Sequence, residues 1–235
     1  MRMNGNAIII TGGASGIGYA MAKYFHARDN QVLICGRRED RLAQAAGELP
    51  GVMTFKCDVT DANDRVSLLN FVKQSFPDAN ILINNAGIQR DVDLTVGLTD
   101  FERGENEIRV NLEAPILLSA LFTEYLAGKD NAMIANVSSG LAFMPDMAFG
   151  MPVYTATKAG LHNFSIAQRK QLAPLGIRVV EIIPPAVESE LNPEGRQKRS
   201  GGRPLGFMSS DEFVEKALAM MAEDEEEIRI VQARA

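Results

Sequence analysis

The sequence contains few of the residue types on which several protein classes depend. Its 235 residues include no tryptophan, two cysteines and two histidines. The spacing of Cys35 and Cys57 fits neither a zinc site nor a CxxC redox pair, so we expect two small buried side chains. His26 and His162 supply too few convergent ligands for a metal centre. The composition therefore predicts no metal site and no disulfide framework.

The chain also lacks an excess of positive charge and a long apolar run. Its formal net charge is -6, whereas a nucleic-acid-binding protein normally presents a basic face. No stretch is long enough to span a bilayer, and residues 1–6 lack the apolar region of a signal peptide. We therefore expect a cytoplasmic protein that binds neither nucleic acid nor membrane.

Apolar runs and segments of helical periodicity alternate from one end of the chain to the other. The predicted strands are Ala7–Thr11, Gln31–Gly36, Met53–Cys57, Ile81–Asn84, Ala132–Val137, Arg178–Ile183 and Ile228–Val231. The predicted helices are Gly16–Arg28, Asp40–Leu49, Thr60–Phe76 with Thr60 as N-cap, Thr99–Leu126 with a break near Gly104, Val153–Leu175 and Ser210–Ala222. This alternation predicts one α/β domain over residues 1–235, a Rossmann-type doubly wound parallel sheet with helices on both faces.

Two long connections interrupt the alternation, at about 140–152 and 188–209. Both follow predicted strands, so they should lie at the carboxyl edge of the sheet, where open α/β sheets bind ligands. The first could form an apolar pocket wall or pack onto its own domain or a neighbouring subunit; its large apolar residues are Leu141, Phe143, Met144, Met147, Phe149 and Met151. The second could be a lid for an anionic substrate or a solvated basic loop; its cations are Arg196, Lys198, Arg199 and Arg203.

A glycine-rich turn joins the first predicted strand to the first predicted helix. Glycines allow a tight turn, and the free N–H groups at a helix N-terminus attract phosphate. The turn therefore predicts a pyrophosphate site, although a tight turn without a ligand is the alternative; its candidate residues are Gly12, Ser15, Gly16, Ile17 and Gly18.

Two arginines end the second strand. An acidic residue at that place would bind the ribose hydroxyl of NAD, whereas Arg37 and Arg38 suit the 2′-phosphate of NADP(H). The alternative is that both arginines are solvated and pair with Glu39 or Asp40.

Tyr154 and Lys158 are four residues apart and so share one face of a predicted helix. A tyrosine ionises near pH 10, and a neighbouring ammonium lowers that value. Tyr154 can then serve as general acid or base, with a hydroxyl from Ser138 or Ser139 near the reacting oxygen. A core-facing tyrosine with an outward-reaching lysine is the alternative for an isolated pair.

The motifs together resemble the short-chain dehydrogenase/reductase family over residues 7 to about 190. The resemblance rests on Thr11-Gly-x-x-x-Gly-Ile-Gly18, Asn84-Asn85-Ala86-Gly87, Asn111, Ser138-Ser139 and Tyr154-x-x-x-Lys158. It implies hydride transfer between NADP(H) and a small carbonyl or alcohol, and a homodimer or homotetramer.

The resemblance also implies individual roles. Ser139 would bind the substrate oxygen, with Ser138 as the second choice. Lys158 would lower the Tyr154 pKa and hold the nicotinamide ribose, and the Asn111 backbone would hold a proton-relaying water. The further cofactor contacts it implies are Asp58, Val59, Asn85, Ala86, Gly87, Pro184, Val187 and Ser189.

The chain departs from the family pattern after the sixth strand, where Pro185 stands in place of a flexible glycine. The Ile182-Ile-Pro-Pro-Ala-Val187 run is similar to a bacterial branch with members encoded beside teichoic-acid D-alanylation genes. A non-catalytic NADP-binding sensor or scaffold remains an alternative function. An epimerase or dehydratase of the extended branch is a third, for which the chain looks too short.

Overall fold

The computed structural model describes residues 2–102, 104–148, 150–188, 190–200 and 207–230. Its seven strands form one parallel sheet in the order β3-β2-β1-β4-β5-β6-β7. The order runs outward from β1 in both directions, which is the doubly wound arrangement that the sequence predicted. The strands are β1 (Ala7–Thr11), β2 (Gln31–Gly36), β3 (Met53–Lys56), β4 (Ile81–Asn84), β5 (Met133–Val137), β6 (Arg178–Ile183) and β7 (Glu227–Arg229).

Helices cover both faces of this sheet because successive strand residues point to opposite sides. Ile8 and Ile10 pack in one apolar cluster, whereas Ile9 packs in the other. The first cluster includes residues of α1 (Gly16–His26), α2 (Glu39–Glu48) and α8 (Ser210–Ala222). The second includes residues of α3 (Ala62–Ser75), α5 (Ala114–Leu126) and α6 (Pro152–Leu172). No helix in these described ranges combines the length and apolar character of a membrane span.

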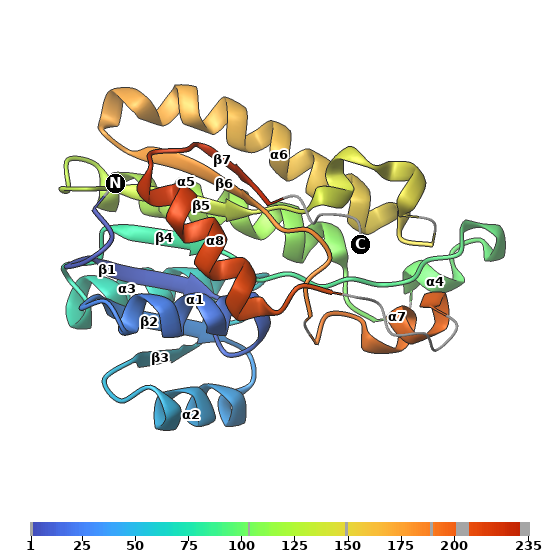
Figure 1. The fold of residues 1–235 in the computed structure, drawn as a ribbon, viewed down its shortest axis with the longest axis horizontal. Coiled ribbons are helices and arrows are strands. Elements are labelled where there is room, and N and C mark those ends of the chain that lie inside the picture. Colours follow the sequence, from blue (N-terminus) through green and yellow to red (C-terminus); the bar gives the residue numbers. More distant parts are fainter. Residues whose placement is uncertain (1, 103, 149, 189, 201–206, 231–235) are drawn as a thin grey trace.

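Several elements project beyond the carboxyl ends of the strands. Figure 1 shows α4 (Thr99–Glu102) and α7 (Pro193–Ser200) at this end of the molecule. Gly104, with a φ of +73°, follows α4, and a π-helical turn over Arg109–Glu113 then leads into α5. The predicted break near Gly104 is therefore confirmed.

Two details of the predicted elements are wrong. Helix α3 begins at Ala62, and its N-cap is Asp61 rather than Thr60, because the Asp61 carboxylate accepts from the N–H groups of residues 63 and 64. The Thr60 hydroxyl instead donates to Asp58. The second correction concerns residues 188–209, which the sequence predicted as an unbroken loop but which contain α7. Asn192 accepts from the N–H of Gly195 there, and an Asn-Pro pair at a helix start is the signal that could have shown it.

Buried asparagines fix α6 against the sheet. Asn136 on β5 donates from its side-chain amide to Ser165 and Gln168, both on α6. Its side-chain oxygen accepts from Asn84 on β4, which is the residue opposite it in the register. These bonds hold α6 against β5 and β4, although the Asn84 Oδ1 and Gln168 Nε2 atoms of the network have no hydrogen-bond partner among the described residues.

A fully buried carboxylate lies one strand further along. Glu181 on β6 accepts a hydrogen bond from the Ser138 hydroxyl, and its other oxygen is 2.7 Å from Nδ1 of His162 on α6. A buried charge without partners is costly, so the two contacts compensate for taking this carboxylate out of water. They also connect the end of β5 to β6 and α6.

We expect Ser138→Ala to lower the free energy of unfolding by about 1–3 kcal/mol, because it leaves one oxygen of the buried carboxylate without its donor. Urea unfolding measures this. Ser67→Ala on the exposed face of α3 is the matched control and should change stability by less than about 0.5 kcal/mol. Equal effects of the two substitutions would contradict the assigned role of the Ser138 hydroxyl.

Candidate active site

The glycine-rich turn lies between the end of β1 and the start of α1. Gly12 and Gly16 have φ values of +64° and +53°, which favour glycine. Ser15 is the N-cap of α1, yet its hydroxyl makes no capping bond, and the first turn of α1 carries no acidic residue. The Ser15 side chain therefore does not cap the first N–H groups of α1, and a pyrophosphate site at this turn stays a prediction.

The turn packs closely against the segment that follows β4. The Thr11 hydroxyl accepts from the N–H groups of Asn85 and Ala86, each at 3.0 Å. The Asn85 amide donates to the carbonyls of Thr11 and Gly12. A Cβ added at Gly18 would lie 2.3 Å from the Gly12 carbonyl oxygen, so only glycine fits there. The two predicted cofactor segments therefore form one rigid unit.

The two arginines after β2 make ion pairs across long sequence distances. Arg37 pairs with Glu105, and Arg38 pairs with Glu190 and also donates to the Ser15 hydroxyl at 3.1 Å. Glu39, one of the partners considered above, pairs with Lys56 instead. Arg38 therefore lies directly beside the glycine-rich turn.

Residues after β3 reach the same edge. Asp58 accepts from the backbone N–H and the hydroxyl of Thr60. Its carboxyl pKa is lowered, because these hydrogen bonds and the charges of Arg37 and Arg109 outweigh the opposing effect of burial. Val59 is buried, and Ala86 and Val110 lie close to it.

Tyr154 and Lys158 lie on the first two turns of α6, and both are buried. The Lys158 ammonium is 5.8 Å from the centroid of the Tyr154 ring and donates to the Val137 carbonyl at 2.8 Å. Burial lowers the pKa of Lys158 to about 8, and the negative charge of Glu181 acts in the opposite direction. The geometry thus confines a positive charge next to the tyrosine.

The two serines at the end of β5 have different surroundings. Ser138 donates to Glu181, as described above, and so faces β6. Ser139 accepts from the N–H of Leu141 and caps the short 3₁₀ turn Gly140–Phe143. This difference favours Ser139 over Ser138 as the serine that contacts substrate.

Asn111 lies in the middle of the π-helical turn and is fully buried. Its side chain accepts from the N–H of Ile88 and donates to the Ile88 carbonyl, both at 2.8 Å, and also donates to Thr157. A Cβ added at Gly87 would lie 3.3 Å from Asn111 Oδ1 and 3.6 Å from Lys158 Nζ. Gly87, Asn111 and Lys158 therefore meet at one place. Single π turns are frequent at functional sites.

The segment after β6 follows the same edge. The Pro184 carbonyl accepts from the N–H of Gly140 at 2.9 Å, which joins it to the serine segment. Val187 is buried and pairs with Met208 in an isolated parallel bridge. The predicted contact Ser189 lies outside the described residues, as does Arg203.

Sequence reasoning missed three residues that the fold brings to this site. Arg41 on α2 forms an ion pair with Glu190, and the charge of the buried Glu181 raises the pKa of Lys158 against the effect of burial. Arg41 carried a readable signal, because it lies one helical turn from Arg38. Glu190 and Glu181 carried none.

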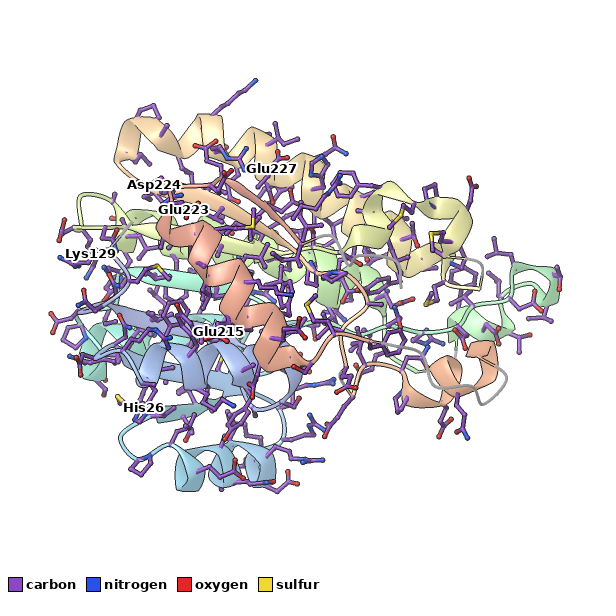
Figure 2. The ribbon with its side chains drawn as sticks, viewed as in Figure 1. His26, Lys129, Glu215, Glu223, Asp224 and Glu227 are labelled. Atoms are coloured by element: carbon purple, nitrogen blue, oxygen red, sulfur yellow. The ribbon has the colours of Figure 1, made fainter. Side chains whose placement is uncertain are left out.

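One group of metal-capable side chains occurs among the described residues, outside the predicted site. Atoms of His162, Glu181 and Glu227 lie within 4.8 Å of one another. Glu181 already has hydrogen bonds to Ser138 and His162, and Arg169 is 3.7 Å from a Glu227 oxygen. Hydrogen bonds and an ion pair therefore account for this group. Figure 2 labels Glu223 and Asp224, which follow α8, and Glu227, which begins β7, and all three side chains are exposed.

We expect the stability of the protein to rise between about pH 8 and pH 10 through Lys158. Its folded-state pKa of about 8 lies below the ordinary value, so in this range the unfolded chain binds more protons than the folded chain. Lys158→Met removes this contribution. Urea unfolding at pH 8 and pH 10 should show the wild type gaining about 2 kcal/mol relative to the variant. Parallel pH dependences would show that Lys158 has an unshifted pKa.

Comparisons with known proteins agree with this geometry. The family model "short chain dehydrogenase" matches residues 6–200. The uncharacterized oxidoreductase DltE of Bacillus subtilis is 42% identical over 228 residues, which cover 97% of this chain and 89% of that protein. This relative bears out the predicted resemblance to the branch found near teichoic-acid D-alanylation genes.

Two solved structures share the fold over nearly the whole chain. A short-chain dehydrogenase from Sphingobium yanoikuyae in complex with NADPH has a TM-score of 0.79 and 28% identity, covering 95% of this chain and 87% of that one. The 3-ketoacyl-(acyl-carrier-protein) reductase from Brucella melitensis complexed with NADH has a TM-score of 0.79 and 27% identity, covering 93% and 91%. The protein is thus an oxidoreductase of the short-chain dehydrogenase/reductase family.

Proposed function

We propose that this protein transfers a hydride between NADP(H) and a carbonyl or alcohol substrate, with Tyr154 as general acid and base. The observation that carries the proposal is the buried Lys158 ammonium beside Tyr154 on α6. A tyrosine is useful in proton transfer near neutral pH only when a positive charge lowers its pKa. Burying the Lys158 charge lowers the stability of the folded protein, so stability alone does not explain why it lies there.

The neighbouring residues suit the remaining parts of the reaction. In the reducing direction Tyr154 donates its phenolic proton to the carbonyl oxygen, and the Lys158 ammonium stabilises the phenolate that is left. The Ser139 hydroxyl donates to the same oxygen as negative charge develops there. Asn111 lies close to Gly87 and Lys158, and we assign to its backbone the water that would relay protons to Lys158.

The cofactor residues present fit a dinucleotide. The N-terminus of α1 and the glycine-rich turn would hold the pyrophosphate, and Lys158 would hold the nicotinamide ribose hydroxyls. Asp58 and Val59 would border the adenine. Arg37 and Arg38 would hold a 2′-phosphate, which supports NADP(H) over NAD(H). When bound, the nicotinamide supplies or accepts the hydride, and the protein contributes orientation and charge.

The segment from Gly140 to Pro152 suits an apolar part of the substrate. Met144 and Met147 are exposed by 45% and 66%, which leaves apolar surface at this edge of the sheet, whereas the Phe143 ring packs against His162 and Arg229. Phe149 lies outside the described residues. Methionines adapt to ligands of varied shape, so we propose a substrate with an apolar group next to its carbonyl. A cytoplasmic location and a homodimer or homotetramer stay predictions of the sequence.

We expect NADPH to bind much more tightly than NADH, and Arg38→Met to weaken NADPH about tenfold while changing NADH less than about twofold, because the lost contact is to a charged phosphate. Emission of the bound nicotinamide reports binding, and the chain has no tryptophan to interfere. Lys170→Met at the exposed end of α6 is the matched control. Equal affinities of the wild type for both cofactors would rule out the NADP assignment. If neither cofactor binds, the proposed enzymatic function is ruled out.

We expect Tyr154→Phe to leave NADPH binding unchanged and to reduce turnover by about 10²–10⁴-fold, since it removes only the transferable proton. The assay follows NADPH oxidation over a panel of apolar ketones and aldehydes. Loss of cofactor binding in the variant would show that Tyr154 is structural. NADPH binding without turnover of any carbonyl by the wild type would favour the sensor alternative.

A further inference from the structure

Glu190, in the segment after β6, reaches back across the carboxyl edge to α2. One carboxylate oxygen is 3.2 Å from Nη1 of Arg38, and the other is 3.0 Å from Nη2 of Arg41. Arg38 uses its second terminal nitrogen to bind the Ser15 hydroxyl in the glycine-rich turn. A single anion therefore bridges two guanidinium groups directly beside the predicted pyrophosphate site.

The chemistry of this contact is the chemistry of phosphate recognition. Carboxylate and phosphate oxygens accept the same charge-assisted hydrogen bonds from guanidinium groups. Arg38 directly precedes α2 and Arg41 lies one turn later on this helix, so both can contact one anion. The Glu190, Arg38 and Arg41 side chains are 50%, 53% and 39% exposed, so this ion pair is accessible to solvent and weak enough to exchange.

We propose that Arg41 is a further ligand of the 2′-phosphate of NADP(H), and that Glu190 is a specificity-determining residue that competes with this phosphate for Arg38 and Arg41. This inference rests on the proposed use of NADP(H). A phosphate and the Glu190 carboxylate on the same two guanidinium groups would repel each other, so binding of one displaces the other. Glu190 thus lowers the affinity for NADP(H) and leaves that for NAD(H) unchanged.

The competition would also connect the cofactor to the segment that carries Glu190. Val187 and Met208 pair just before and well after this residue, and α7 lies between them. Glu190 is the described contact of this segment with Arg38 and Arg41. A 2′-phosphate would therefore displace Glu190 from Arg38 and Arg41, whereas a ribose hydroxyl would leave it in place.

The test uses the full chain and two small probes that differ only in the 2′-phosphate: adenosine 2′,5′-bisphosphate and adenosine 5′-monophosphate. Isothermal titration calorimetry gives the affinity of each. Glu190→Gln should tighten binding of the bisphosphate about threefold to tenfold, because it removes exposed ion pairs that compete with the phosphate. The affinity for the monophosphate should change less than about twofold. Arg41→Met should weaken the bisphosphate about fivefold and spare the monophosphate.

Glu188→Gln is the matched control, because it makes the same charge change two residues away on an exposed side chain. The proposal is overturned if Glu190→Gln leaves the bisphosphate affinity unchanged, if both probes tighten equally, or if Glu188→Gln has the same effect. Failure of the underlying NADP assignment looks different. In that case the bisphosphate binds no better than the monophosphate in the wild type and in every variant.

Discussion

The hydrogen bond from the Lys158 ammonium to the Val137 carbonyl holds the candidate site together. It joins α6 to the last residue of β5 at the point where the serine segment begins. Burial of the ammonium is costly without such a partner, so this bond favours the observed arrangement of the strand end and the helix. The tyrosine one turn earlier on α6, and the serines that follow Val137, are placed by the same contact.

The buried polar groups around this bond show how that position is enforced. Asn136 fixes α6 from the middle of β5, and Glu181 fixes Ser138 from β6. Another arrangement of the same strands would break these hydrogen bonds, and an unpaired buried amide or carboxylate costs more than its hydrogen bond contributes. Polar groups at the centre of the sheet thus specify the geometry, and the apolar clusters on its two faces supply the driving force.

Much of this fold could be predicted because the signals are local. Continuous apolar runs identified the strands, and the glycines of the first turn could be read because Gly12 and Gly16 need positive φ. The prediction of Thr60 as the N-cap of α3 was wrong because Asp61 and Thr60 are both good capping residues. The choice between them depends on the hydrogen bond from Thr60 to Asp58. Contacts between distant segments left no local signal. The pairing of Arg41 with Glu190 spans 149 positions.

The departure at Pro185 is easier to understand with the structure. The preceding carbonyl, that of Pro184, accepts from the N–H of Gly140, so the turn after β6 is held by the serine segment. Because the neighbouring Pro184 carbonyl is already held, this turn does not need the backbone flexibility of glycine. Pro185 differs from glycine in lacking a backbone N–H donor. The close approach between the two segments is made possible by Gly140 in the serine segment, because a Cβ at Gly140 would lie 3.3 Å from the Pro184 oxygen.

Carboxylates on or just after β6 face both cationic parts of the site, and burial decides what each can do. Glu181 is fully buried, has two hydrogen-bond partners and acts on Lys158 by raising its pKa against the effect of burial. Its hydrogen bonds compensate for the loss of hydration on folding, and exchanging these partners would leave a buried charge unpaired. Glu190 is half exposed, so water can replace its arginines at little cost. The same functional group is therefore a fixed part of the site at the proposed nicotinamide end and, in our proposal, an exchangeable one at the adenosine end.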